Sequence, residues 1–124
     1  MRVSDQEYFR SCVAKERHLA QLLGHRNIEE CYESAGVLWE EAQPLPKWTR
    51  DWSACGPLMA KHHIAIAYGA EPGQADIGFA TIGATVVHFA DHPSRDRALM
   101  VGIVKVVIRQ LEHPHVTARP QQAA

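Results

Sequence analysis

One long apolar segment near the C-terminus, RALMVGIVKVVIRQLE at 97–112, constrains the fold more than any other part of the chain. Its β-branched run, Val101–Ile108, has the composition of a buried strand. However, the segment extends about twenty residues from a helix-capping Ser94, which is longer than an ordinary strand. Its charged residues recur at steps of three, four or eight and form a narrow stripe: Arg97, Lys105, Arg109 and Glu112. We therefore predict a mostly buried helix that Pro114 ends.

The N-terminal third is predicted to form two antiparallel helices joined by the short turn GHRN at 24–27. Ser4 and Glu7 match a capping box that opens the first helix, and Gly24 supplies its C-terminal stop. Asn27 is expected to cap the second helix, although Gly36 inside it costs about 1 kcal/mol relative to Ala. The apolar stripes comprise Phe9, Cys12, Val13, Leu19, Ala20 and Leu23, then Ile28, Cys31, Tyr32, Ala35, Leu38, Trp39 and Ala42.

The middle of the chain is predicted to hold a connection, a short helix and a small sheet. Pro44 and Pro46 favour an extended connection over 43–52, and GPLMAKH at 56–62 forms a short helix with Pro57 in its first turn. HIAIAY at 63–68 is typical of a strand, and AEPGQAD at 70–76 of a loop. IGFATIGATVVHFA at 77–90 predicts one or two strands with Gly83 at a bend or bulge.

These elements predict an α+β fold: an N-terminal helix pair, a small two- or three-stranded antiparallel sheet, and a long C-terminal helix packed on it. The length of 124 residues fits a single domain, which we place at 1–112. The polar, proline-containing end at 113–124 is expected to be disordered.

Composition narrows the function classes. The formal charge of −1 makes nucleic acid an unlikely partner, and the apolar runs are too short to span a membrane. The polar N-terminus lacks the apolar core of a signal peptide, so a cytoplasmic location is expected. Three widely spaced cysteines fit reduced thiols better than disulfides. No glycine-rich phosphate loop is present, so no cofactor is predicted.

Cys55, in the stretch DWSACGPLMAKHHIAIAY at 51–68, is the candidate nucleophile. It is expected just before a helix N-terminus, where the helix dipole lowers a thiol pKa. His62 or His63 would act as the base, and Asp51 would orient that base. The alternative, which we favour, is a small buried side chain before a turn, because free cysteines are among the most buried residues.

A metal site is the second chemical hypothesis, because eight histidines are many for this length. His88, Asp91 and His92 lie close together in HFADH and would need a distant further ligand. The spacing matches no specific zinc motif, and structural or surface histidines are the favoured alternative.

Two further groups of residues have both a binding and a structural interpretation. The tryptophans around the proline-bearing connection, Trp39, Trp48 and Trp52, form either a partner-binding surface or anchors that hold that connection on the core. The cations Arg95, Arg97, Lys105 and Arg109 either bind phosphate near Ser94 or form a solvated helix face. In both groups we favour the structural interpretation.

The stretch TRDWSACGPLMAKHHIAI at 49–66 resembles the NinX-like family of small uncharacterised phage and prophage proteins. The shared features are an Asp-Trp, then a Gly-Pro followed by two apolar residues, a charged helix end, a strand and a C-terminal helix. The similarity covers roughly 48–111, and Cys55 replaces an expected second Gly. The resemblance implies a phage or prophage origin and no known reaction. For the chain itself, the binding candidates are Trp48, Trp52, Gly56 and Pro57.

We thus rank three functions. The first, a non-enzymatic function, is an accessory protein that binds an unknown protein partner. It can form a homodimer through an open sheet edge. The second is a small cysteine-dependent hydrolase or transferase at Cys55. The third is a histidine-based metal-binding protein.

Overall fold

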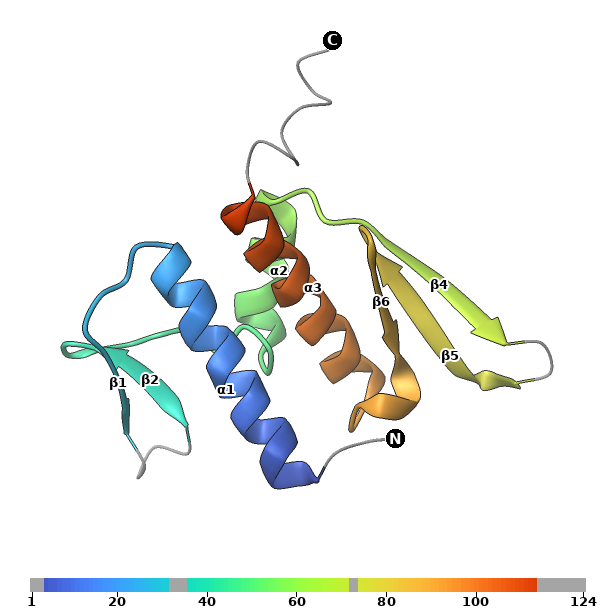
Figure 1. Ribbon diagram of the computed structural model, residues 1–124, viewed down its shortest axis with the longest axis horizontal. Coiled ribbons are helices and arrows are strands. Elements are labelled where there is room, and N and C mark those ends of the chain that lie inside the picture. Colours follow the sequence, from blue (N-terminus) through green and yellow to red (C-terminus); the bar gives the residue numbers. More distant parts are fainter. Residues whose placement is uncertain (1–3, 32–35, 72–73, 114–124) are drawn as a thin grey trace, which may run out of the picture.

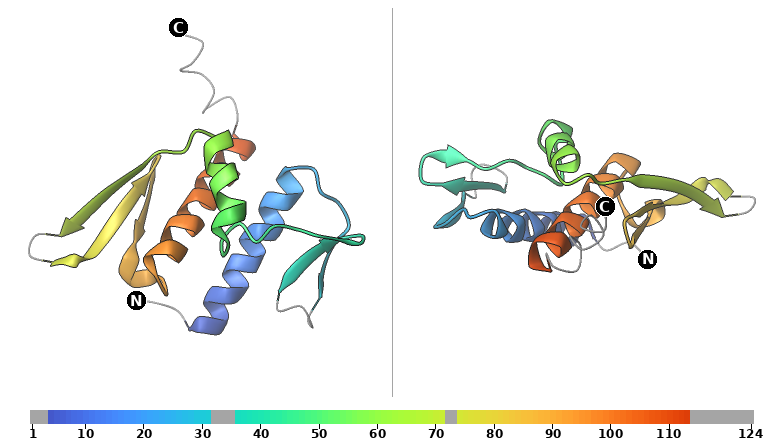
Figure 2. Two further views of the ribbon diagram at one scale, coloured as in Figure 1. Left: turned by 180° about the vertical axis from the view of Figure 1, so that it is seen from behind. Right: turned by 90° about the horizontal axis from the view of Figure 1, so that it is seen from above.

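The long C-terminal helix α3, Arg95–Glu112, lies at the centre of the molecule, with α1, Asp5–Leu22, packed beside it (Figure 1). The computed structural model describes residues 4–31, 36–71 and 74–113. A third helix, α2, Trp52–Lys61, packs against α3 and lies in front of it in Figure 2. None of the helices in these described ranges is sufficiently long and apolar to cross a membrane.

Two small antiparallel sheets flank this helical centre (Figure 1). Beyond α1 lies the sheet of β1, Ile28–Cys31, β2, Val37–Glu40, and β3, Gln43–Pro44. Beyond α3 lies the second sheet, in the order β4, Ile66–Glu71, β5, Gln74–Ile82, and β6, Thr85–His88. A short 3-10 turn η2, Phe89–Asp91, then leads into α3. The α+β class is therefore confirmed, with a second sheet that the sequence does not predict.

The buried C-terminal helix is confirmed. The Ser94 hydroxyl accepts a 3.1 Å hydrogen bond from the Arg97 backbone N–H, which caps the first turn. Ten of the helix residues are buried, whereas Lys105, Arg109 and Glu112 of the polar stripe are exposed. The capping box of α1 is also confirmed, since Ser4 and Glu7 exchange both hydrogen bonds.

The predicted second helix from Asn27 is wrong, because this region forms the β1–β2 hairpin. Asn27 does not cap a helix but adopts a left-handed backbone with φ of 56°. Gly36 has φ of +78°, and a Cβ there would approach the Phe9 ring to 2.4 Å. These two positions interrupt any continuous helix, so Leu38 reaches the core from a strand instead. Residues 32–35 of the predicted helix lie outside the described residues.

Helix α2 begins earlier than the sequence predicts. Asp51 caps α2 by accepting from the Ser53 backbone N–H at 3.0 Å, so the helix starts at Trp52 and Pro57 lies inside it. Because Pro57 has no backbone N–H, the Ser53 carbonyl lacks the hydrogen bond that it would otherwise accept from the residue four positions later. The predicted strand at 63–68 begins only at Ile66, whereas 77–90 does contain two strands with a turn at Gly83. Of the predicted loop and tail, 72–73 and 114–124 lie outside the described residues.

A buried carboxylate joins α1 to the connection that precedes α2. Glu16 has only 1% of its surface exposed, and its oxygens accept hydrogen bonds from the Thr49 backbone and hydroxyl groups. Arg50 completes the cluster with two further hydrogen bonds of 3.0 and 2.6 Å to Glu16. The same guanidinium donates to the Gly36 carbonyl and stacks on Phe9. One ion pair thus holds α1, the hairpin turn and the connection together.

The close approach of α3 to the sheet depends on Gly102. A Cβ at this position would lie 2.4 Å from Ile82 Cδ1 and 3.0 Å from Val87 Cγ1. Ile82 and Val87 are themselves buried, so the neighbouring atoms have little room to move. The glycine therefore sets the distance between the central helix and the second sheet.

We predict that Gly102→Ala lowers the free energy of unfolding by about 1–3 kcal/mol, because overpacking outweighs the better helix propensity of Ala. Urea unfolding with both midpoint and slope measured checks this. The control is the same substitution combined with Ile82→Val, which removes the Cδ1 atom. The loss caused by Gly102→Ala should be smaller in that background, and an equal loss in both would contradict the proposed contact.

We also predict that Glu16→Gln destabilises the fold by about 3 kcal/mol, because it leaves the Arg50 guanidinium without its buried counter-charge. The matched control is Glu30→Gln, which breaks the partly exposed Arg17–Glu30 pair at 3.8 Å. That loss should stay below about 1 kcal/mol. Similar losses for the two variants in thermal unfolding would show that the buried cluster does not organise the fold.

Candidate functional site

Cys55 lacks the geometry of a nucleophile. It lies within α2 and is completely buried, and burial raises its pKa to about 12. His62 ends the same helix seven residues later, which corresponds to a rise of about 10 Å along the axis. Asp51 is committed to capping, and the hydrogen bonds from Ser53 lower its pKa. The structure thus fits the alternative of a buried structural thiol.

The two adjacent histidines form no pair with Cys55 either. His62 is half-buried at the C-cap of α2, whereas His63 is exposed in a left-handed turn with φ of 54°. Burial lowers the pKa of His62, and the charge of Lys61 lowers it further, whereas a hydrogen bond with Gln110 opposes this. Both residues precede β4, so His63 does not lie in the strand that the sequence predicts for it.

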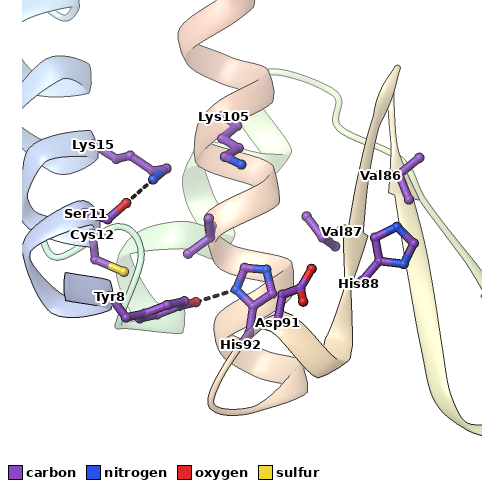
Figure 3. A pocket seen from close by; sticks show the side chains of 11 residues that line it. Tyr8, Ser11, Cys12, Lys15, Val86, Val87, His88, Asp91, His92 and Lys105 are labelled. Atoms are coloured by element: carbon purple, nitrogen blue, oxygen red, sulfur yellow. Dashed lines mark hydrogen bonds between the residues drawn. The ribbon is translucent and has the colours of Figure 1, made fainter. Parts of the chain in front are cut away.

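The metal candidates do not converge. His88 contacts the Phe79 ring on one face of the sheet, with ring centroids 6.0 Å apart, and points away from His92 (Figure 3). Within 4–31, 36–71 and 74–113, no three His, Cys, Asp or Glu side chains gather as a potential metal-ligand set. All three candidates line one pocket, but their side chains do not come together around a single point as metal ligands would.

Two of the three tryptophans, Trp48 and Trp52, hold elements together. Trp48 is 5% exposed and belongs to the main core, which removes it from the binding candidates. Trp52 keeps 37% exposure but donates its indole N–H to Asp96 at 3.0 Å, which links the first turns of α2 and α3. Gly56 and Pro57 lie on the same helix, and Pro57 is exposed.

A cavity of about 280 Å³ lies where α1, α3, β6 and the η2 turn meet (Figure 3). Helix α1 contributes residues at steps of three and four, which share one face of a helix. Helix α3 contributes two residues one turn apart. Together with β6 and η2 they form the lining, which consists of Tyr8, Ser11, Cys12, Lys15, Val86, Val87, His88, Asp91, His92, Val101 and Lys105.

A short polar contact closes one end of this pocket. The Tyr8 hydroxyl and His92 Nδ1 are 2.5 Å apart, and the two rings meet edge to face (Figure 3). Burial lowers the pKa of His92, Asp91 opposes that shift, and the nearby cations Lys105, Lys15 and Arg97 reinforce it. The neutral imidazole is therefore favoured, and its Nδ1 shares one hydrogen bond with the tyrosine hydroxyl, whose direction depends on the histidine tautomer.

The described lining of the pocket carries more positive than negative charge. Lys15 is half-buried and donates to the Ser11 hydroxyl at 2.5 Å, and Lys105 faces it across the pocket (Figure 3). Burial lowers the pKa of Lys15, the charge of Lys105 lowers it further, and Cys12 opposes the shift. No ion pair joins either ammonium group to a carboxylate in the part of the chain that the structure describes.

Arg97 adds a third cation behind the pocket wall. Its guanidinium lies 5.3 Å from the Tyr8 ring centroid and donates to Cys12 Sγ at 3.4 Å. The Nε atom is buried and has no hydrogen-bond partner among the described residues. A buried donor without a partner is costly, and an anion in this region would offset that cost.

Sequence reasoning found part of this site. It identified Arg97 and Lys105 as phosphate ligands or a solvated face, but it did not consider Tyr8, Ser11 or Lys15. A signal was present, since Tyr8, Ser11 and Lys15 recur at steps of three and four along α1. Polar residues at such spacing indicate that they share one side of a helix. They do not show which other element packs against that side.

Comparison of the chain with protein-family models, with curated proteins and with solved structures found no match. The resemblance to the NinX-like family therefore stays a prediction. The function must be argued from the pocket itself.

We predict that Cys55 stays unmodified when the folded protein is treated with iodoacetamide at neutral pH, because the thiol is buried and its pKa is about 12. In denaturant the same cysteine should react readily. Mass spectrometry of the peptide that contains Cys55 measures both. Rapid labelling in the folded state would restore the cysteine-dependent enzyme as a hypothesis.

Proposed function

We propose that this chain is a binding protein for a small anion, a carboxylate or a phosphate, in the pocket between α1, α3 and β6. The observation that carries the proposal is the pair of lysines, Lys15 and Lys105, that face one cavity without an ion-pair partner among the described residues. A half-buried lysine without a counter-ion is unusual, and such perturbed groups cluster at functional sites.

The chemistry of the remaining lining supports the same ligand class. The Ser11 hydroxyl provides an additional donor, and Arg97 lies directly behind Tyr8 and Cys12. Asp91 is the single carboxylate among the described lining residues, so positive charge exceeds negative charge in the pocket. Its volume of about 280 Å³ lies near the lower end for ligand pockets, which suits a small molecule.

Protein binding, the first function predicted from the sequence, has less support. Among the described residues, the exposed large apolar ones are Trp52, Tyr68 and Val86. Tyr68 pairs across the sheet with Ala80, whereas Val86 pairs with the next residue, Thr81, so these two side chains lie on opposite faces. They do not form a continuous apolar patch. A protein partner, a homodimer and a phage origin stay predictions.

We predict that inorganic phosphate raises the melting temperature relative to chloride at equal ionic strength, and that Lys105→Met removes this effect. Phosphate at one hundred times its Kd would stabilise the folded state by about 2.7 kcal/mol. Without phosphate, Lys105→Met should be at least as stable as the unsubstituted protein, because it relieves repulsion with Lys15.

The control is Lys61→Met, which removes an exposed lysine at the end of α2. Lys61 is not part of the pocket lining. This variant should keep the full response to phosphate. Equal responses from the Lys105→Met and Lys61→Met variants would show a general salt effect and would remove the proposed function.

A further inference from the structure

Lys15 combines three properties that a nucleophilic amine needs. Its side chain extends toward the pocket from α1, and it is half-buried (Figure 3). Its only hydrogen bond given by the structure is to Ser11, which is a neutral partner. Burial and the facing Lys105 lower its pKa, so a larger share of this amine is unprotonated at neutral pH. The same arrangement activates lysines that form imines in general.

We propose that Lys15 forms a reversible imine with a small 2-oxo acid whose carboxylate is held by Lys105, which lines the same cavity. The inference rests on the proposed function, because the anion site is what brings the carbonyl compound to the amine. It names the ligand class: a molecule that carries a carboxylate and an adjacent carbonyl. The cavity of about 280 Å³ holds such a small acid.

The step balances without an oxidant or reductant. The lone pair of Lys15 Nζ attacks the carbonyl carbon, and the carbonyl oxygen takes up a proton to give a carbinolamine. That hydroxyl then leaves as water with a further proton, and a C=N bond replaces the C=O bond. The nitrogen loses both of its N–H hydrogens to the departing water.

The Tyr8–His92 pair is suited to move the protons that this step requires. The two groups line the same cavity as Lys15 and share a 2.5 Å contact between the hydroxyl and Nδ1. A neutral imidazole accepts a proton and a tyrosine hydroxyl donates one, so the pair can pass a proton along its hydrogen bond. The titratable side chains that line the cavity with Lys15 come from every element around it: Tyr8 and Cys12 from α1, His88 from β6, Asp91 from η2, His92 directly after η2, and Lys105 from α3.

The test is reductive trapping. Full-length protein is incubated with glyoxylate, the smallest 2-oxo acid, and cyanoborohydride at pH 7, and the modified lysines are located by peptide mass spectrometry. The chain has four lysines, so Lys47 and Lys61 serve as internal references. Lys15 should be modified at least tenfold faster than either. Equal rates at the three positions would overturn the inference.

Two substitutions at one position separate charge from structure. Lys105→Met should shift the pH profile of Lys15 trapping to higher pH, because it removes a facing positive charge. Lys105→Arg keeps that charge, so its profile should stay near that of the unsubstituted protein. Identical profiles for the two variants would show that Lys105 does not activate Lys15 and would overturn the proposed arrangement.

Two responses of the unsubstituted protein, stabilisation by phosphate and trapping at Lys15, distinguish this inference from the proposed function. Phosphate stabilisation without selective trapping at Lys15 in the unsubstituted protein would leave an anion-binding protein with no imine chemistry. If the unsubstituted protein shows neither stabilisation by phosphate nor selective trapping at Lys15, both proposals are wrong.

Discussion

The buried ion pair between Glu16 and Arg50 is the contact on which the arrangement of this fold depends. Glu16 is 1% exposed, and a carboxylate at that depth is tolerable only because Thr49 and Arg50 supply four hydrogen bonds. The cluster fixes the rotation of α1 about its own axis. Since Lys15 precedes Glu16 in the same helix, that rotation also turns Lys15 and Tyr8 toward α3. The structural core and the candidate site are thus set by one interaction.

The pocket and this cluster differ in whether opposite charges are paired. Glu16 and Arg50 neutralise each other, whereas Lys15 and Lys105 face one another without a counter-ion among the described residues. A half-buried lysine that faces a second, exposed lysine opposes folding, and a chain under selection for stability alone would remove one of the two charges. Such local inconsistency is characteristic of functional sites, where a ligand completes the set of charges. This is the physical reason why we propose a function for this pocket and not for Cys55.

Much of the fold follows from local pattern, and the largest error has a definable cause. The capping residues Ser4 and Ser94 and the periodicity of α3 are local signals, and both helices form as predicted. The hairpin at β1–β2 was mistaken for a helix because its apolar residues also fit helical spacing. Its turns depend on left-handed backbone at Asn27 and Gly36, and the contact of Gly36 with Phe9 is tertiary. The site was predicted only in part, since Arg97 and Lys105 were named without their partners on α1.

The sequence by itself determined the elements whose signals are local. These are the two long helices, the α+β class, the strand pair around Gly83 and the lack of a recognisable catalytic motif. Tertiary structure alone decided that Tyr8 and Lys15 line one pocket with His92 and Lys105. Those residues lie some eighty to ninety positions apart in the chain, so no periodicity within either segment reveals their contact. The pocket exists because α1 and α3 pack side by side, and packing depends on the whole core.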